Sequence, residues 1–105
     1  MINLKTQLAD ISCEIIAKVG AAKGLFVEAI RSAMDGNNEV AKRQIAEGEE
    51  IFREGRKLHS TLLTKFANGE EVTVDILLVH AQCQMMSAED FKVIAEQFVY
   101  NGERE

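Results

Sequence analysis

The feature that most constrains the fold is an apolar stripe that runs through the first third of the chain. Its members recur at steps of three and four residues: Leu4, Leu8, Ile11, Ile15, Val19, Ala22, Phe26, Ile30 and Ala33. This spacing places the apolar side chains on one face of an α-helix, whereas a strand would need alternation. The sequence therefore predicts one long amphipathic helix that ends before "DGNN".

Two further long helices are expected after this break. Gly36 suits the left-handed position that follows a helix, and Asn37 or Asn38 suits the cap of the next helix. A second apolar stripe contains Ile45, Gly48, Phe52, Gly55, His59, Leu62, Leu63 and Phe66. The third helix is expected to be capped by Asp75 and to run to about Tyr100, which leaves "NGERE" as a frayed tail.

The Asn68-Gly69 pair between the second and third helices also suits a tight hairpin turn between strands. The preceding "LHSTLLTKF" keeps helical spacing, so a helix end is expected there instead. With 105 residues and no proline, the chain is predicted to be a single all-α domain over residues 1–105, an antiparallel three-helix bundle. Helix-interior glycines Gly20, Gly24, Gly48 and Gly55 are expected to mark close approaches between helices.

The start of the third helix indicates self-association. Ile76, Leu77, Leu78 and Val79 cover every side of its first turn, and a lone three-helix bundle buries only one of those sides. A parallel arrangement of several copies around a symmetry axis would cover the remaining apolar face.

Charge and cysteine content exclude several classes of function. The formal net charge is −5 and no run of Lys or Arg is present, which argues against nucleic acid or an anionic membrane as a partner. Cys13 and Cys83 lie far apart and do not have the spacing of a metal site. With no secretory signal and no long apolar run at the start, the sequence predicts a cytoplasmic protein with free thiols.

The stretch "DILLVHAQCQMM" holds the main candidate for chemistry, His80. One interpretation is a core histidine with satisfied hydrogen bonds, the usual role of a lone histidine on a helix. The other is a nucleophile desolvated by its apolar neighbours and oriented by Gln82, Cys83 and Gln84. A metal site of His, Cys and Gln is the weakest interpretation, because Gln is a poor ligand for transition metals. His59, on the second stripe, is expected to be a core or interface histidine.

These residues also carry a resemblance to a known family. "VDILLVHAQCQMMSAEDFKVIAEQFV" resembles the third helix of the lactose/cellobiose (N,N'-diacetylchitobiose)-type enzyme IIA components of the bacterial phosphoenolpyruvate-dependent sugar phosphotransferase system. That family's motif reads roughly L-L-x-V-H-A-Q-D-H-L-M-T. "EIIAKVGAAKGLFVEAI" and "GNNEVAKRQIAEGEEIFREGRKLHSTLLTKFANGEEVTV" extend the resemblance to nearly the whole chain.

The resemblance implies a fold, a function and partners. It implies a homotrimer of nine helices with the third helices around the axis. His80 matches the histidine that accepts a phosphoryl group from the carrier HPr and passes it to a cysteine of enzyme IIB, with the membrane enzyme IIC involved indirectly. Gln82, Gln84 and His59 would then form the shell around the phosphoryl group. The alternative is a non-catalytic trimeric interaction or regulatory module that retains the fold.

The chain departs from the family's pattern at two motif positions. Cys83 stands where the family has an aspartate that resembles an axial magnesium ligand, and Gln84 stands where a second histidine follows. Three axial carboxylates would repel one another without a metal, whereas Cys83 behaves as a small apolar residue. We therefore expect no cofactor, and a trimer axis at Cys83 that needs no magnesium. Zinc held by three thiolates is the alternative.

Overall fold

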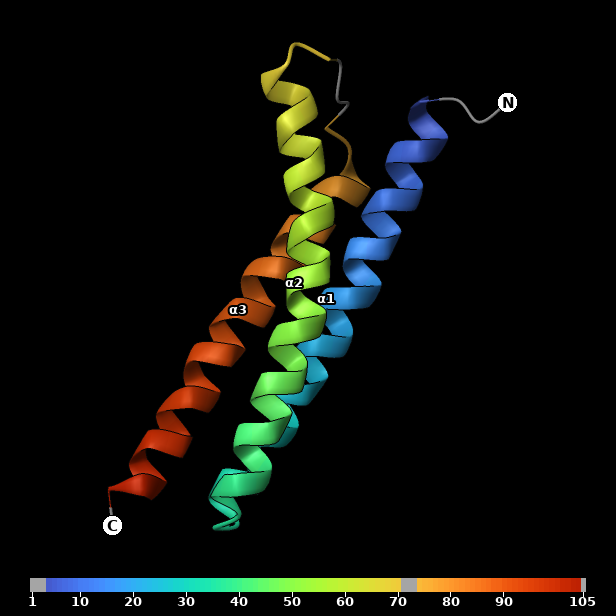
Figure 1. The fold of residues 1–105 in the computed structure, drawn as a ribbon. Coiled ribbons are helices and arrows are strands. Elements are labelled where there is room, and N and C mark those ends of the chain that lie inside the picture. Colours follow the sequence, from blue (N-terminus) through green and yellow to red (C-terminus); the bar gives the residue numbers. More distant parts are fainter. Residues whose placement is uncertain (1–3, 71–73, 105) are drawn as a thin grey trace.

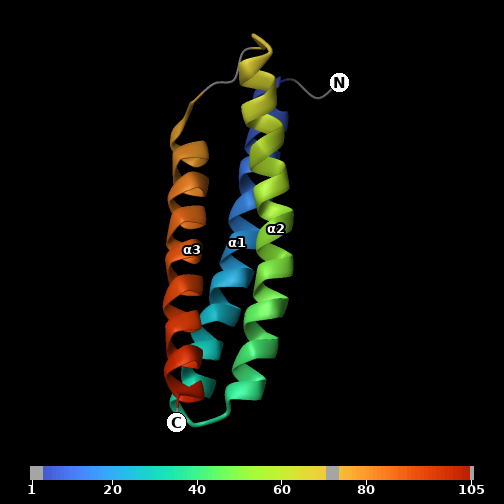
Figure 2. The same cartoon turned by 60° about the vertical axis from the view of Figure 1, so that its left-hand side comes forward.

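The computed structural model describes residues 4–70 and 74–104, and its fold is a bundle of three helices. They are α1 (Leu4–Met34), α2 (Asn38–Ala67) and α3 (Ile76–Glu103). In Figures 1 and 2, α1 and α3 run in the same direction and α2 runs in the opposite direction, and α1 packs against both of the other helices. The described residues contain no strand, and the molecule measures 56 × 23 × 19 Å. The predicted all-α antiparallel bundle is confirmed.

The helix ends follow the turn residues closely. Gly36 and Gly69 adopt positive φ angles of 82° and 83°, the left-handed conformation that ends a helix at little cost only for glycine. Asn37 occupies the cap position of α2, but its side chain makes no capping hydrogen bond. Asp75 caps α3 as predicted, because its carboxylate accepts a hydrogen bond of 2.9 Å from the backbone N–H of Leu78.

The core is built from one face of each helix. Its members are buried: Leu8, Ile15, Val19, Ala22, Phe26, Ala29, Ala41, Phe52, Leu62, Leu78, Ala81, Ala88, Ala95 and Val99. The side chain of Leu4, which the sequence places on the first stripe, lies outside the described side chains. The core residues Ala81, Ala88 and Ala95 of α3 have small side chains, so this helix packs closely against α1. None of the helices in the described ranges is apolar over a long enough stretch to cross a bilayer.

The glycines of α2 and α1 have different roles. A Cβ atom on Gly48 would lie 2.7 Å from Cε1 of the buried Phe26 ring, and one on Gly55 would lie 2.9 Å from Cγ1 of Val19. These two glycines therefore allow α2 to approach α1 closely, as predicted. The same prediction was wrong for Gly20 and Gly24, which are exposed and have nothing within 4 Å of an added Cβ.

A pair of substitutions tests this difference. We expect Gly48→Ala to lower the free energy of unfolding by about 1–2 kcal/mol, because the overpacking at Phe26 outweighs the better helix propensity of alanine. Gly24→Ala, the matched control, should raise it by about 0.5–1 kcal/mol, since only the propensity changes. Urea unfolding followed by circular dichroism measures both. Equal and stabilising effects would contradict the close approach at Gly48.

The end of α3 is held more firmly than a frayed tail. The helix continues to Glu103, and the Asn38 side chain donates a hydrogen bond of 3.0 Å to the carbonyl oxygen of Val99. Lys42 forms an ion pair with Glu103, whose carboxylate raises the pKa of Lys42 through a hydrogen bond. These contacts tie α3 to the start of α2, so the expectation of fraying from Asn101 onward was wrong as far as Glu103.

Candidate functional site

His80 lies in the second turn of α3 and is exposed to solvent. Its neighbours Leu78 and Ala81 are buried, so they fix the backbone on which the imidazole is carried. The interpretation of His80 as a core histidine is therefore wrong for the single chain, and so is the expected desolvation by its apolar neighbours. An exposed imidazole on a rigid helix is accessible to a second protein.

Gln82 and His59 form a polar contact between α3 and α2. The amide nitrogen of Gln82 lies 3.2 Å from Nε2 of His59, and both side chains are half-buried. An amide nitrogen only donates, so with this amide orientation Nε2 accepts and the His59 proton resides on Nδ1. The contact fixes the Gln82 side chain on the α2 flank of α3, and His59 is half-buried at the α2–α3 contact.

The single chain does not bring His80 and Gln82 together. Residues two apart on an α-helix point about 200° away from each other, so His80 and Gln82 lie on opposite flanks of α3. Gln84 is four residues after His80 and lies on the same side of the helix, where it is half-buried. The predicted site residues thus form two groups, His80 with Gln84 and Gln82 with His59.

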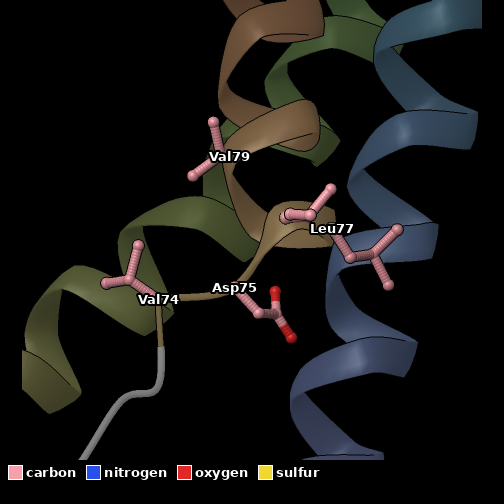
Figure 3. A pocket seen from close by; sticks show the side chains of 5 residues that line it. Val74, Asp75, Leu77 and Val79 are labelled. Atoms are coloured by element: carbon pink, nitrogen blue, oxygen red, sulfur yellow. The ribbon is translucent and has the colours of Figure 1, made fainter.

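A second apolar stripe of α3 lies between the two flanks and faces away from the core. This outer stripe consists of exposed residues at steps of three and four: Ile76, Val79, Cys83, Met86, Asp90, Val93, Gln97 and Tyr100. Ile76 is 89% exposed and Met86 is 67% exposed. Figure 3 shows the beginning of this surface, with Val74 and Val79 on the side of the segment away from α1. Only the first turn of this stripe was predicted from the sequence, although the same spacing continues to Tyr100.

The outer stripe has the pattern of a coiled-coil seam. A repeat of seven residues with apolar side chains at two positions is what associating helices use. Within the stripe the polar members are Asp90 and Gln97, and the remaining members are apolar. The uncovered face that the sequence predicted is therefore present on this chain along the length of α3.

The side chain of Cys83 is not a suitable ligand for a magnesium ion. Magnesium prefers hard oxygen ligands, whereas position 83 offers a thiol. Within residues 4–70 and 74–104, no group of three or more His, Cys, Asp or Glu side chains is placed to hold a metal. The axial magnesium that the family resemblance implies therefore has no ligand at this position.

Comparisons with a family model and with individual known proteins point to the same family. Residues 10–101 match the family model described as the PTS system, lactose/cellobiose-specific IIA subunit. The chain is 39% identical over 85 residues to the PTS system galactose-specific EIIA component of Lactococcus lactis subsp. cremoris (81% of this chain, 73% of the relative). It is 37% identical over 90 residues to the cellobiose-specific EIIA component of Lactococcus lactis subsp. lactis (86% and 78%).

A solved structure has the same fold. The PTS cellobiose-specific enzyme IIA from Bacillus anthracis superposes with a TM-score of 0.88 at 26% identity, over 99% of this chain and 93% of that one. Helix order and packing are therefore shared along almost the entire chain.

Proposed function

The chain belongs to the lactose/cellobiose-specific IIA family of the PTS system, and on that premise we propose that His80 is its phosphoryl-carrying residue. His80 accepts the group from the phosphohistidine of HPr and passes it to the cysteine of enzyme IIB during uptake of a lactose/cellobiose-type sugar. The observation that carries this proposal is the solvent-exposed His80 imidazole on a helix whose neighbouring residues are buried.

Phosphoryl transfer requires above all that the partner protein can reach the His80 imidazole. An imidazole nitrogen of His80 attacks phosphorus, a new N–P bond forms, and the N–P bond to the HPr histidine breaks. In the second step the thiolate of enzyme IIB attacks, an S–P bond forms, and the N–P bond to His80 breaks. Both attacks are in line, so the partner must reach His80 from solvent, and the exposed flank of α3 permits this.

The outer stripe supports assembly as a homotrimer with the three α3 helices in parallel around an axis. In such an arrangement the stripe faces the axis, and the flank of one helix lies against the opposite flank of its neighbour. His80 of one chain then faces the flank that carries Gln82 and His59 of the next. The two groups that a single chain keeps apart are thereby brought to one site.

Gln82 acts at this shared site as a donor to the phosphoryl oxygens. Its amide is held by His59 on one side, and its second N–H remains available for a phosphoryl oxygen of the neighbouring chain. Gln84 lies on the His80 flank and would support the same group from its own chain. Cys83 lies at the axis, where an apolar thiol needs no magnesium.

A transfer assay tests the proposed function. The protein is incubated with phosphoenolpyruvate, enzyme I and HPr, and its intact mass is measured without acid, which would hydrolyse phosphohistidine. We expect a gain of one phosphoryl group. If a control acceptor is phosphorylated and this chain is not, the alternative holds, a trimeric interaction module in which Cys83 and Gln84 mark a lost activity.

Mixing a slowed variant with an inactive one tests whether the site is shared between chains. Gln82→Ala should slow phosphoryl uptake about tenfold or more, the effect of losing one hydrogen bond to a charged group. His80→Gln should accept nothing. After co-refolding in equal amounts, about half of the remaining His80 side chains face an intact Gln82 in a neighbouring chain, so the rate per His80 should rise severalfold.

The control for this experiment is the same pair mixed without unfolding, in which chains do not exchange. An unchanged rate per His80 after co-refolding would show that Gln82 does not act across the interface.

A further inference from the structure

His80 and Cys83 are two metal-binding side chains that share one exposed surface of α3. They are three residues apart, so they lie one helical turn from each other, with Cβ atoms about 5–6 Å apart. Both are exposed in the single chain. Between Val79 and Gln84 the chain has no carboxylate, so the strong donors on this turn are one imidazole and one thiol.

This donor pair selects soft and borderline cations. Imidazole nitrogen and thiolate sulfur are the ligands that zinc uses in proteins, whereas magnesium and calcium require oxygen. We propose that His80 and Cys83 chelate a soft divalent cation such as Zn²⁺, and that the bound ion blocks phosphoryl uptake at His80. The metal site stands on the two side chains alone, and its inhibitory effect rests on the proposed function.

The ion competes with the phosphoryl group for the same nitrogen. Coordination uses the lone pair of the imidazole that would otherwise attack phosphorus, and binding releases the proton of the Cys83 thiol. The two occupants are therefore mutually exclusive at His80. Removal of the ion by a chelator should restore uptake, because no covalent bond has changed.

Water completes the coordination. One chain supplies two ligands, and zinc usually has four. Solvent molecules fill the remaining positions, so each His80 binds an ion of its own.

The chain contains matched controls for both ligands. Cys13 is an exposed free thiol on α1, and it lacks a histidine in its own helix. His59 is the other histidine, and its Nε2 is already in contact with Gln82. Substitutions at Cys13 and His59 therefore remove a thiol or an imidazole without touching the proposed chelate.

Two measurements test the proposal. The first is direct binding of Cd²⁺, a spectroscopic substitute for Zn²⁺, followed by the ultraviolet absorption of the cadmium–thiolate bond. We expect the absorption in the wild type and in Cys13→Ser, and its loss in Cys83→Ser and weakening in His80→Gln but not in His59→Gln. Absorption that persists in Cys83→Ser would overturn the site.

The second measurement is phosphoryl uptake with and without Zn²⁺, each variant compared with its own metal-free rate and with a control acceptor to exclude inhibition of enzyme I or HPr. At a Zn²⁺ concentration about ten times the dissociation constant, about a tenth of the wild-type His80 remains free, so uptake should fall about tenfold. Cys83→Ser should lose this inhibition, while Cys13→Ser should keep it. Equal inhibition of Cys83→Ser would overturn the proposed competition. If uptake is absent even without metal, the proposed function fails, and the cadmium measurement still decides the metal site.

Discussion

Replacing His80 by Gln is expected to abolish phosphoryl uptake and to leave both the helical fold and the trimer intact. Glutamine has a similar length and good helix propensity, but its amide is not a nucleophile for phosphorus. The side chain is exposed, and an exposed substitution changes the free energy of unfolding by about 0.5 kcal/mol or less. The variant should therefore lose phosphoryl uptake while it keeps its stability and its assembly.

Intact mass after the transfer reaction measures the uptake, and light scattering during gel filtration measures the assembly. His59→Gln is the matched control, since it removes the other histidine of the chain by the same substitution. This variant should still gain one phosphoryl group at the end point. A His80→Gln chain that falls apart into monomers would instead assign His80 a structural role.

The helices and their ends were predictable because local spacing and turn chemistry determine them. The 3–4 spacing from Leu8 to Ala33 defined α1, and Gly36 and Asp75 marked real helix ends. The continuation of α3 to Glu103 was missed, because it depends on Asn38 and Lys42, which lie more than 50 residues earlier in the sequence.

The environment of the candidate site was not predictable from the sequence. The motif made His80 the candidate, and four apolar neighbours suggested that it is buried, but the structure exposes it. Those neighbours divide between two faces of α3: Leu78 enters the core, whereas Ile76 and Val79 belong to the outer stripe. Periodicity reveals that two faces are apolar, and only the fold reveals which one the chain itself covers. The contact between Gln82 and His59 likewise required the pairing of α2 with α3.

A glutamate at Met86 is expected to dissociate the trimer. Met86 is 67% exposed in the single chain and lies in the middle of the outer stripe. A trimer assembled around this stripe would bury the Met86 side chains of all three copies near the axis. Three carboxylates in an apolar seam repel one another and lose their hydration, a cost of several kcal/mol per buried charge. Phosphoryl uptake should fall with the assembly, because His80 then lacks the Gln82 of its neighbour.

Met34→Glu is the matched control, because Met34 is 69% exposed at the end of α1, outside the stripe. Light scattering should give a trimer for the wild type and for Met34→Glu, and a monomer for Met86→Glu with unchanged helical circular dichroism. A trimer that survives Met86→Glu would show that another surface holds the copies together.

Light scattering in a chelating buffer distinguishes a trimer held together by apolar packing from one held together by a bound metal ion. With a thiol at Cys83, apolar packing alone should hold the copies, so removal of divalent ions should leave the mass of the trimer unchanged. Dissociation in chelator, reversed by magnesium, would instead indicate Asp90, the carboxylate of the outer stripe, one heptad after Cys83. In that case Asp90→Leu should form a trimer whose mass does not change in the chelating buffer. This result would identify Asp90 as the residue that places negative charge at the axis.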